Sequence, residues 1–314
     1  VESASMPFAE LHYPFENQNL FAQRFPSDFV SEYIAQTSAW FYVMHVISTL
    51  EFGHAPFKIV VPTGNILAEN DNKMSKSKNN FPDPWILIEK YGIDAIRFYL
   101  LTSPVMNGDD FNFSEKGVSE VNKKVNLLLY NVWSFLRLYD KQLYSTENTA
   151  DSINVLDKWI LEKLFELQKE VTKQLDAYST VKAGKIIVVF INELSTWYVR
   201  RSRDRMKLQN AESQAGLKTL AYVLIELSKI LAPFMPFLAE FIYKDLTGKE
   251  SVHLELWSEF SSDANSKLLL DMEAVREIVN IGLSVRKEKS LAVRQPLASF
   301  AFSLAFAASV RRNS

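Results

Sequence analysis

The sequence contains no cysteine, which excludes disulfide bonds, thiol catalysis and thiolate zinc sites. Its four histidines are scattered along the chain and do not indicate a metal centre. No apolar run approaches the roughly 20 residues that a membrane span needs, and no charged-then-apolar leader opens the chain. We therefore expect a soluble, cytoplasmic protein without a protein-bound metal or a membrane role.

Net charge is nearly absent too, because 35 Lys and Arg balance 37 Asp and Glu to leave −2. Any site for a polyanion must therefore be a local concentration of cations. With 47% hydrophobic and 13% aromatic residues, the 314 residues can bury the cores of about two domains. The chain starts at Val1 and ends in the repetitive "SFAFSLAFAASVRRNS", so we expect it to be truncated at both ends.

The first third of the chain has an α/β pattern. The segment "AWFYVMHVISTLEFG" predicts a helix closed by Gly53, and "FKIVVPTG" predicts a buried strand over residues 57–64. Two helices should follow, one beginning at Pro84 and one running from Asp94 to before Pro104. The sequence thus predicts alternating strands and helices up to about residue 118.

From residue 119 the pattern becomes helical throughout. Apolar residues recur at three- and four-residue spacing over residues 121–139, 156–175, 186–197 and 217–231. Residues 248–260 look like a loop or short strand, and residues 271–290 like a last helix. The predicted fold class is α/β followed by all-α, with a helix bundle after a boundary near residue 118.

A cationic loop, "NKMSKSKNN", follows "TGNILAEND", which predicts a short strand running into a turn. Lysines are the usual filling of exposed loops, so a solvated turn is the ordinary interpretation. Met74, however, is apolar and predicts docking onto a surface. Loops at the carboxyl ends of parallel strands bind phosphorylated ligands, and a lysine ammonium can follow a phosphate as charge moves. The loop is therefore a candidate phosphate site.

The stretch "KMSKS" at residues 73–77 resembles the second signature of the class I aminoacyl-tRNA synthetases. The longer "GNILAENDNKMSKSKNNFPDP" is similar to the branched-chain subgroup. The resemblance implies that the loop closes over ATP carrying Mg²⁺ on its triphosphate. Lys76 would then stabilise the departing pyrophosphate with help from Lys73. The implied ATP-binding residues are Gly64, Lys73, Met74, Ser75, Lys76 and Ser77.

The segment "FPSDFVSEYIAQTSAWFY" is similar to the amino-acid and adenylate site of the isoleucyl-tRNA synthetases. The resemblance carries binding roles over to Glu32, Gln36 and Trp40. The chain departs from the family pattern at Tyr33 and Ala35, and at Ser38 and Ala39 before the tryptophan, so no contacts are assigned through Tyr33 or Ala35. Ordinary core packing is the alternative for Trp40.

The segment "LSTWYVRRSRDRMK" also resembles the isoleucyl family, at the end of a bundle helix. Five cations in eight residues next to an aromatic suit the phosphates and unstacked bases of an RNA loop. A solvated helix end, favoured by the helix dipole, is the alternative. The candidate tRNA-binding residues are Trp197, Arg200, Arg201, Arg203, Arg205 and Lys207.

The resemblance, which ends near Leu297, implies a division into four parts. Residues 1–79 would be the second half of a Rossmann-type catalytic domain, 80–118 a stem-contact segment, 119–248 the anticodon-binding bundle and 249–314 an extension. The implied reaction is activation of isoleucine by ATP and its transfer to tRNA(Ile). The chain has no His-x-Gly-His signature and no resemblance to an editing domain, so we expect it to be a C-terminal fragment that is inactive alone.

Three alternatives remain open at this point. The chain could come from a valyl or leucyl enzyme of the same class. A second alternative is a non-catalytic tRNA-binding module, to which the departures at Tyr33 and Ala35 give some weight. A third is a helical scaffold with a basic face, for which Arg200 and Arg203 would not affect tRNA affinity.

Overall fold

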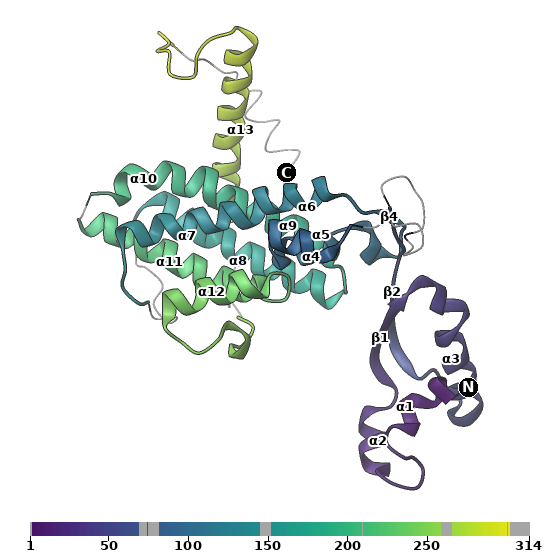
Figure 1. Cartoon of the computed structure of the whole chain (residues 1–314). Coiled ribbons are helices and arrows are strands. Elements are labelled where there is room, and N and C mark those ends of the chain that lie inside the picture. The colour runs from purple at the N-terminus through teal and green to yellow at the C-terminus, as the bar shows by residue number, and fades with distance from the viewer. Residues whose placement is uncertain are drawn as a thin grey trace. The chain divides into compact units, whose positions relative to one another are not determined.

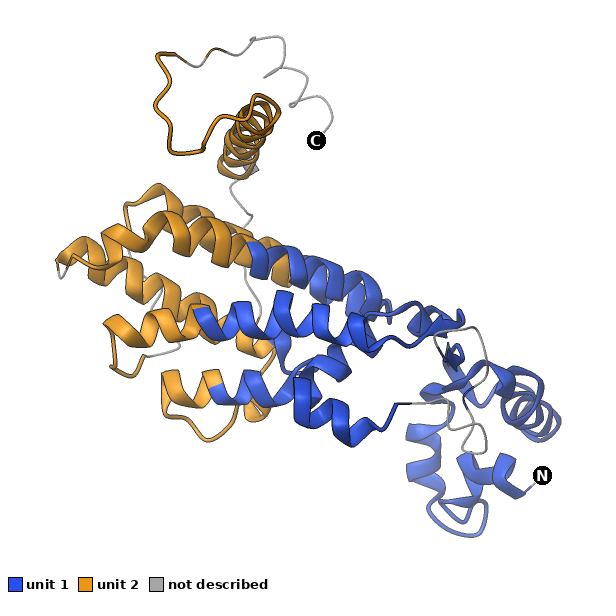
Figure 2. Cartoon of the chain, turned by 45° about the horizontal axis from the view of Figure 1, so that its top comes forward, with its two compact units in different colours: residues 1–131, 170–192, 230–241 blue, residues 132–169, 193–229, 242–314 orange. Residues whose placement is uncertain are grey.

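The computed structural model describes residues 2–68, 74, 82–144, 152–208, 210–258, 266–299 and 301. The chain divides into two compact units, coloured separately in Figure 2. Unit 1 comprises residues 1–131, 170–192 and 230–241, and unit 2 comprises residues 132–169, 193–229 and 242–314. Several long helices pass from one unit into the other, and each unit is described by itself below.

Unit 1 begins with short helical turns and a parallel strand pair (Figure 1). The turns are η1 (Glu2–Ser5), α1 (Met6–Ala9), α2 (Gln18–Arg24) and η2 (Ile34–Ser38). β1 (Ser27–Tyr33) pairs in parallel with β2 (Phe57–Thr63), and α3 (Trp40–Phe52) connects them. Gly53 ends α3 at φ 77°, a left-handed conformation that glycine adopts without strain. The predicted helix, the strand and the α/β pattern are confirmed.

The prediction that β2 is a buried strand is wrong. Ile59 and Val60 are 41% and 38% exposed. Among the described residues β2 pairs only with β1. The packed side of this lobe is a small cluster of Ala4, Phe41 and Met44, against which Phe57 lies. Apolar content predicts a strand, but burial depends on how many layers cover the sheet.

A second, very short parallel pair follows. β3 (Ile66–Leu67), the strand expected before the cationic loop, pairs with β4 (Phe111–Asn112), which the sequence did not reveal. Between them in the chain lie α4 (Pro84–Tyr91), α5 (Ile93–Leu101) and η4 (Pro104–Asn107). The helix starting at Pro84, the break at Gly92 and the second helix are confirmed.

Met74 packs against an apolar cluster formed by these elements. The buried members are Leu87, Ala95, Phe113 and Val118. The prediction that Met74 docks onto a surface is therefore confirmed, and the surface belongs to the segment that follows the cationic loop. Lys73, Ser75, Lys76 and Ser77 lie outside the described residues.

The remaining elements are helical, which was predicted for the four long runs and the last helix, whereas Val252–Leu254 form a short 3-10 helix where the sequence predicts a loop or short strand. They are α6 (Glu115–Val121), the π-helical η5 (Asn122–Asn126), α7 (Leu127–Tyr139), α8 (Val155–Asp176), α9 (Thr180–Glu193), the π-helical η6 (Leu194–Val199), α10 (Arg200–Met206), α11 (Ala211–Leu231), α12 (Pro236–Thr247), η7 (Val252–Leu254) and α13 (Ser266–Glu288). The predicted boundary near residue 118 falls inside α6, which continues directly into η5 and α7. The sequence did not predict α12.

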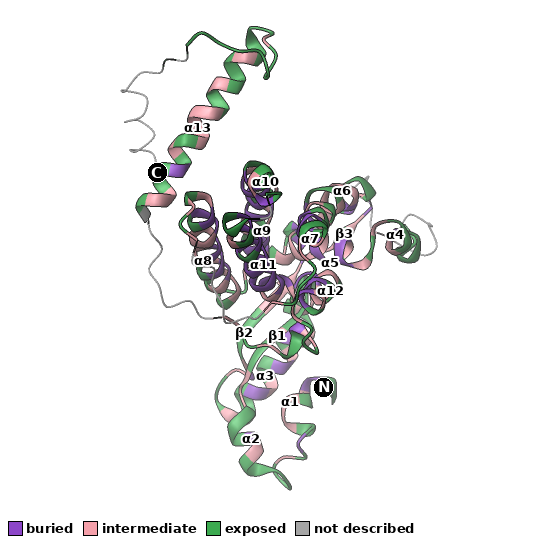
Figure 3. Ribbon diagram, turned by 90° about the vertical axis from the view of Figure 1, so that its left-hand side faces the viewer, coloured by how far each residue is buried: buried purple, intermediate pink, exposed green. Residues whose placement is uncertain are grey.

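Burial is heaviest along α11, as Figure 3 shows. Every residue from Leu220 to Ser228 is at most 7% exposed. In unit 1, buried Asp94 on α5 accepts hydrogen bonds from the backbone N–H of Leu238, at 2.7 Å, and of Phe237, at 3.4 Å, at the start of α12. In the part of the chain that the structure describes, no helix has the length and apolar content that crossing a bilayer requires.

Candidate functional site

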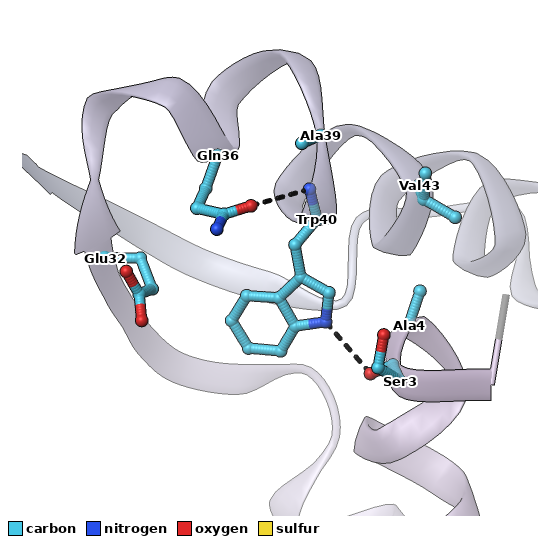
Figure 4. Close-up of a pocket in the computed structure, with 7 residues that line it drawn as sticks. All are labelled: Ser3, Ala4, Glu32, Gln36, Ala39, Trp40 and Val43. Carbon is cyan, nitrogen blue, oxygen red and sulfur yellow. Dashed lines mark hydrogen bonds between the residues drawn. The ribbon is translucent and has the colours of Figure 1, made fainter.

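The residues predicted to bind the amino acid and adenylate share one pocket in unit 1 (Figure 4). Glu32 comes from β1, Gln36 from η2 and Trp40 from the first residue of α3. The open pocket has a volume of about 610 Å³. It lies beyond the carboxyl end of β1, where parallel α/β sheets place their ligands. The three predicted residues come from the end of a strand, a short helical turn and the start of a helix, and the structure places them in the same pocket.

Two hydrogen bonds fix the aromatic wall of this pocket. The side-chain oxygen of Gln36 accepts from the backbone N–H of Trp40 at 3.1 Å. The indole Nε1–H donates to the backbone oxygen of Ser3 at 2.9 Å. Trp40 also packs against the small apolar cluster of the lobe, so core packing accounts for part of its burial. The remaining half-exposed ring face is available to a ligand.

Among the described residues that line this pocket, Glu32 provides the only carboxylate. Its Oε2 accepts one hydrogen bond, at 3.0 Å, from the backbone N–H of Tyr33. An ionised carboxylate has several acceptor positions, so Glu32 keeps capacity for an ammonium group. Tyr33 is 43% exposed and Ala35 is exposed, and neither lines the pocket.

The pocket is also lined by Ala39 and Val43, next to the predicted residues, and by Ser3 and Ala4, which the sequence did not reveal. Ser3 and Ala4 lie on η1, more than thirty positions before Trp40, with no motif of their own. Their contribution is the backbone oxygen and the small Ala4 side chain, and neither leaves a sequence signal.

Gly64, predicted to contact ATP, has a structural role in the described residues. Its N–H donates to the backbone oxygen of Val105 at 2.7 Å. A Cβ at this position would lie 1.9 Å from the backbone oxygen of Asp109. Only glycine allows this approach, which holds the strand before the cationic loop against the η4 region.

The basic segment forms α10 in unit 2. Arg200, Arg201, Arg203 and Lys207 are exposed. The guanidinium of Arg203 lies 5.5 Å from the ring centre of Phe135 on α7, an arrangement that favours a cation–π contact. The ammonium of Lys207 lies 3.5 Å from a carboxylate oxygen of exposed Asp204. An exposed ion pair at this distance is too weak to cancel the charge of Lys207. These cations are accessible to a polyanion.

Trp197 is half-buried and is flanked by cations. The guanidinium carbon of Arg201 lies 5.2 Å from the indole, and that of Arg276 on α13 lies 5.4 Å from it. Arg276 also donates a hydrogen bond to buried Glu193. Trp197 is thus engaged by two arginines in the described structure, whereas the sequence predicts that it is a surface for RNA bases.

Arg205 differs from its neighbours on α10. It is one of the predicted tRNA-binding residues, but its side chain is only 12% exposed and pairs with Asp157, whose side chain is 0% exposed. The contact is bidentate, with Nη1 and Nη2 at 2.9 and 2.5 Å from the two carboxylate oxygens. Spacing along α10 could not show this, because Asp157 is 48 residues away.

Comparison with protein families agrees with this arrangement. Residues 1–114 match the model for tRNA synthetases class I (I, L, M and V), and residues 157–301 match the model for the anticodon-binding domain of tRNA ligase. The chain belongs to the class I aminoacyl-tRNA synthetases, with part of the catalytic domain followed by an anticodon-binding domain.

Within this class the chain is isoleucine–tRNA ligase-like. It is 42% identical to the isoleucine–tRNA ligase of Protochlamydia amoebophila (strain UWE25) over 307 residues, which is 95% of this chain and 30% of that protein. It is 44% identical to that of Bacillus thuringiensis (strain Al Hakam) over 303 residues, 95% of this chain and 29% of that protein. The chain therefore spans about 30% of the length of these curated relatives.

Solved structures share the fold. The Agrobacterium radiobacter K84 LeuRS in a ternary complex with tRNA and LeuAMS superposes with a TM-score of 0.64 at 21% identity, covering 85% of this chain and 33% of that one. Mycobacterium tuberculosis methionyl-tRNA synthetase in complex with methionyl-adenylate gives a TM-score of 0.60 at 21% identity, covering 74% of this chain and 47% of that one. At this identity the likeness establishes fold alone.

Proposed function

We propose that this chain forms the adenylate-binding and tRNA-binding part of an isoleucine–tRNA ligase. The intact enzyme would activate isoleucine with ATP and transfer it to tRNA(Ile). The observation that carries the proposal is the shared pocket of Glu32, Gln36 and Trp40, in a chain 42% identical to an isoleucine–tRNA ligase over 95% of its length.

In the pocket each residue has a chemical role suited to an aminoacyl-adenylate. The Glu32 carboxylate would pair with the α-ammonium of the amino acid. Gln36 uses its oxygen to bond the N–H of Trp40, which leaves its amide nitrogen as the donor for a ligand oxygen. The half-buried indole of Trp40 would cover an apolar group, such as a branched side chain or the adenine ring.

The activation step would place Lys76 and Lys73 at the phosphates. A carboxylate oxygen of isoleucine attacks the α-phosphorus, a new P–O bond forms, and the bond to the β-phosphate breaks to release pyrophosphate. Lys76, assisted by Lys73, would stabilise the negative charge on this leaving group. Ser75 and Ser77 would hold the loop, and Mg²⁺ would arrive bound to the triphosphate of ATP as part of the substrate.

Substitution in the loop tests the assignment of Lys76. Lys76→Ala should weaken ATP binding by about tenfold or more, because one charged contact to phosphate is lost. Lys78→Ala, which removes a lysine of the same loop outside the five-residue signature, is the matched control. Isothermal titration with ATP and Mg²⁺ measures both. Equal losses of ATP affinity in the two variants would show that the lysines attract ATP only through their general positive charge and would contradict the specific role of Lys76.

The adenylate pocket can be tested with a non-hydrolysable isoleucyl-adenylate analogue. Trp40→Ala should weaken its binding by about tenfold or more, because a large apolar contact disappears. Tyr42→Ala is the control, since Tyr42 lies on the same helix, is 60% exposed and does not line the pocket. Equal affinity of the wild type and Trp40→Ala for the analogue would contradict the proposal that this pocket binds the adenylate.

Catalysis is a separate proposal. The 314 residues hold the second class I signature and no His-x-Gly-His element, so they should not by themselves catalyse isoleucine-dependent exchange of pyrophosphate into ATP. Radiolabelled pyrophosphate exchange measures this reaction directly. Measurable exchange that requires isoleucine would show that the first signature is dispensable and would overturn this part of the proposal.

The exposed cations of α10 would bind the tRNA. Arg203→Ala should reduce affinity for tRNA(Ile) by about 5- to 100-fold and lower the salt dependence of binding by about one ion. Lys218→Ala on α11 is the matched control, because it removes an exposed cation of unit 2 that does not belong to α10. If both variants keep wild-type affinity, the helical scaffold remains as the alternative.

Two further features belong to the proposal. The chain would act as a monomer and in the cytoplasm, where tRNA charging serves protein synthesis. Light scattering of the purified chain measures the first feature, and fractionation of cells that carry the protein measures the second. A stable dimer or a membrane-bound pool would contradict them.

A further inference from the structure

The Asp157 carboxylate is the centre of a buried polar network in unit 2. Asp157 lies in the first turn of α8 and its side chain is fully buried. It accepts hydrogen bonds from Arg205, from the hydroxyl of Tyr198 at 2.6 Å and from the hydroxyl of Ser152 at 2.6 Å. The network therefore connects the segment before α8, α8 itself, η6 and α10.

Arg205 makes further contacts with the helices around Asp157. Beyond its two bonds to Asp157, its Nη2 donates to the hydroxyl of Ser202 at 3.0 Å. A Cβ at Gly216 on α11 would lie 2.8 Å from Nη1, so α11 approaches the guanidinium closely. Arg205 is packed between α8 and α11 and has little surface left for a ligand.

Two members of this network, Tyr198 and Arg205, have a raised pKa. Burial, reinforced by the neighbouring Asp157 charge, raises the pKa of Tyr198 well above its ordinary value, so its hydroxyl stays a donor. Burial works against the charge of Arg205, but the bonds to Asp157 outweigh it and raise the pKa of Arg205. Arg205 therefore stays charged over the physiological range.

The geometry of a helix links this network to the exposed cations. At about 100° per residue, Arg200, Arg203 and Lys207 fall within about 60° of one another, whereas Arg205 falls about 140° from Arg200. The first three are exposed and Arg205 is not. The direction in which Arg205 is held therefore determines the direction in which the other three face.

We propose that Arg205 is a positioning residue for tRNA binding, whose bidentate bond to Asp157 fixes the rotation of α10 so that Arg200, Arg203 and Lys207 face outward together. This inference rests on the proposed tRNA-binding function of α10. It removes Arg205 from the set of residues that touch the RNA and adds Asp157, a buried acidic residue, to those on which RNA affinity depends.

It is unfavourable for Arg205 to leave Asp157 and bind an RNA phosphate instead. If a phosphate drew Arg205 out of its site, Asp157 would stay behind as a buried charge without its cation. Breaking such a pair by removing one partner is strongly destabilising. Arg203, by contrast, is exposed and reaches an RNA phosphate at no such cost. The two arginines, two positions apart, thus have different roles.

The direction in which Asp157→Asn changes tRNA affinity distinguishes a positioning role of Arg205 from direct contact with the RNA. Asp157→Asn removes a negative charge near an RNA surface, so simple electrostatics predicts tighter binding of tRNA. Positioning predicts weaker binding, by about tenfold, because the bidentate bond that holds α10 in its orientation is weakened although no exposed cation is removed. The measurement is tRNA(Ile) affinity of the 314-residue chain, well below the unfolding midpoint of each variant.

A second pair of variants provides rescue. Arg205→Met should weaken binding by about tenfold, and the double variant Asp157→Leu/Arg205→Met should restore it to within about twofold, because an apolar pair can replace a buried ion pair. Tyr198 keeps an acceptor there, since its hydroxyl also donates to the backbone oxygen of Gly216 at 3.2 Å. Arg203→Met serves as the control that Asp157→Leu should not rescue.

The outcomes separate this inference from the function on which it rests. Wild-type chain that does not bind tRNA overturns both. Binding that Arg203→Met weakens, but that a folded Asp157→Asn keeps or strengthens, overturns positioning alone. A double variant as weak as Arg205→Met, with the salt dependence lowered by about one ion, would show instead that Arg205 contacts phosphate directly. Weaker binding in Asp157→Asn with an unchanged salt dependence supports the inference.

Discussion

Asp94 offers a sharp test of how unit 1 is held together. Its carboxylate accepts the N–H groups of Leu238 and Phe237, so a residue of α5 does for α12 what an N-cap residue does within one helix. Asp94→Ala would leave both donors unsatisfied. The loss should be about 1–2 kcal/mol for the cap and about 0.3–1 kcal/mol for the interaction with the helix dipole.

The dependence of this contribution on pH has a definite sign. Burial raises the pKa of Asp94 above its ordinary value of 3.8, despite the hydrogen bonds from Leu238 and Phe237. The folded chain therefore binds this proton more tightly than the unfolded chain does. As the pH falls through the folded pKa towards 3.8, the wild type should gain stability relative to Asp94→Asn, which cannot titrate.

Urea unfolding of the wild type and Asp94→Asn, from about pH 7 to about pH 4, measures this difference. Glu115→Gln is the matched control of opposite sign. Hydrogen bonds from Lys90, at 2.6 Å, and Tyr91, at 2.8 Å, lower the pKa of Glu115. Glu115 therefore contributes to the stability of the folded chain above pH 4.5, and this contribution is lost as the pH falls through its lowered pKa. The reasoning is refuted if the wild type loses stability relative to Asp94→Asn as the pH falls.

Three further changes test packing, each by urea unfolding. Gly64→Ala should cost about 1–3 kcal/mol, because its Cβ would lie 1.9 Å from the backbone oxygen of Asp109. Gly53→Ala should cost only about 1 kcal/mol, since φ is 77° but nothing lies within 4 Å of the new Cβ; a larger loss there than at Gly64 would contradict the steric argument. Arg137→Met should cost about 1–3 kcal/mol, because Arg137 donates to Asp245 at 2.6 Å and to the backbone of Gln142 at 2.7 Å, and a neutral result would mark this pair as dispensable.

Local sequence signals predicted the helices well because each signal acts over a few residues. The apolar run ending at Gly53 and the proline at residue 84 set boundaries that the structure keeps. Three-and-four spacing likewise found the long helices α8 and α11. The second strand of the short pair, Phe111–Asn112, was missed because two residues carry no periodicity.

Properties that depend on distant partners were not predictable from the sequence. The β-branched residues of β2 indicate a strand, but its exposure depends on what else covers the sheet. Ser3 enters the pocket through a backbone oxygen. The inward direction of Arg205 is decided by Asp157, which belongs to another helix. Resemblance to a family identified the pocket residues Glu32, Gln36 and Trp40, and the structure supplied their common location.

Discrimination among tRNAs tests the central claim most directly. The 314-residue chain should be titrated with tRNA(Ile), tRNA(Val) and tRNA(Leu) at one fixed salt concentration, because affinities of this kind depend strongly on salt. If the chain comes from an isoleucine enzyme, tRNA(Ile) should bind about tenfold or more tightly than the other two. Equal affinity for all three, or preference for tRNA(Val) or tRNA(Leu), would contradict the assignment to an isoleucine enzyme.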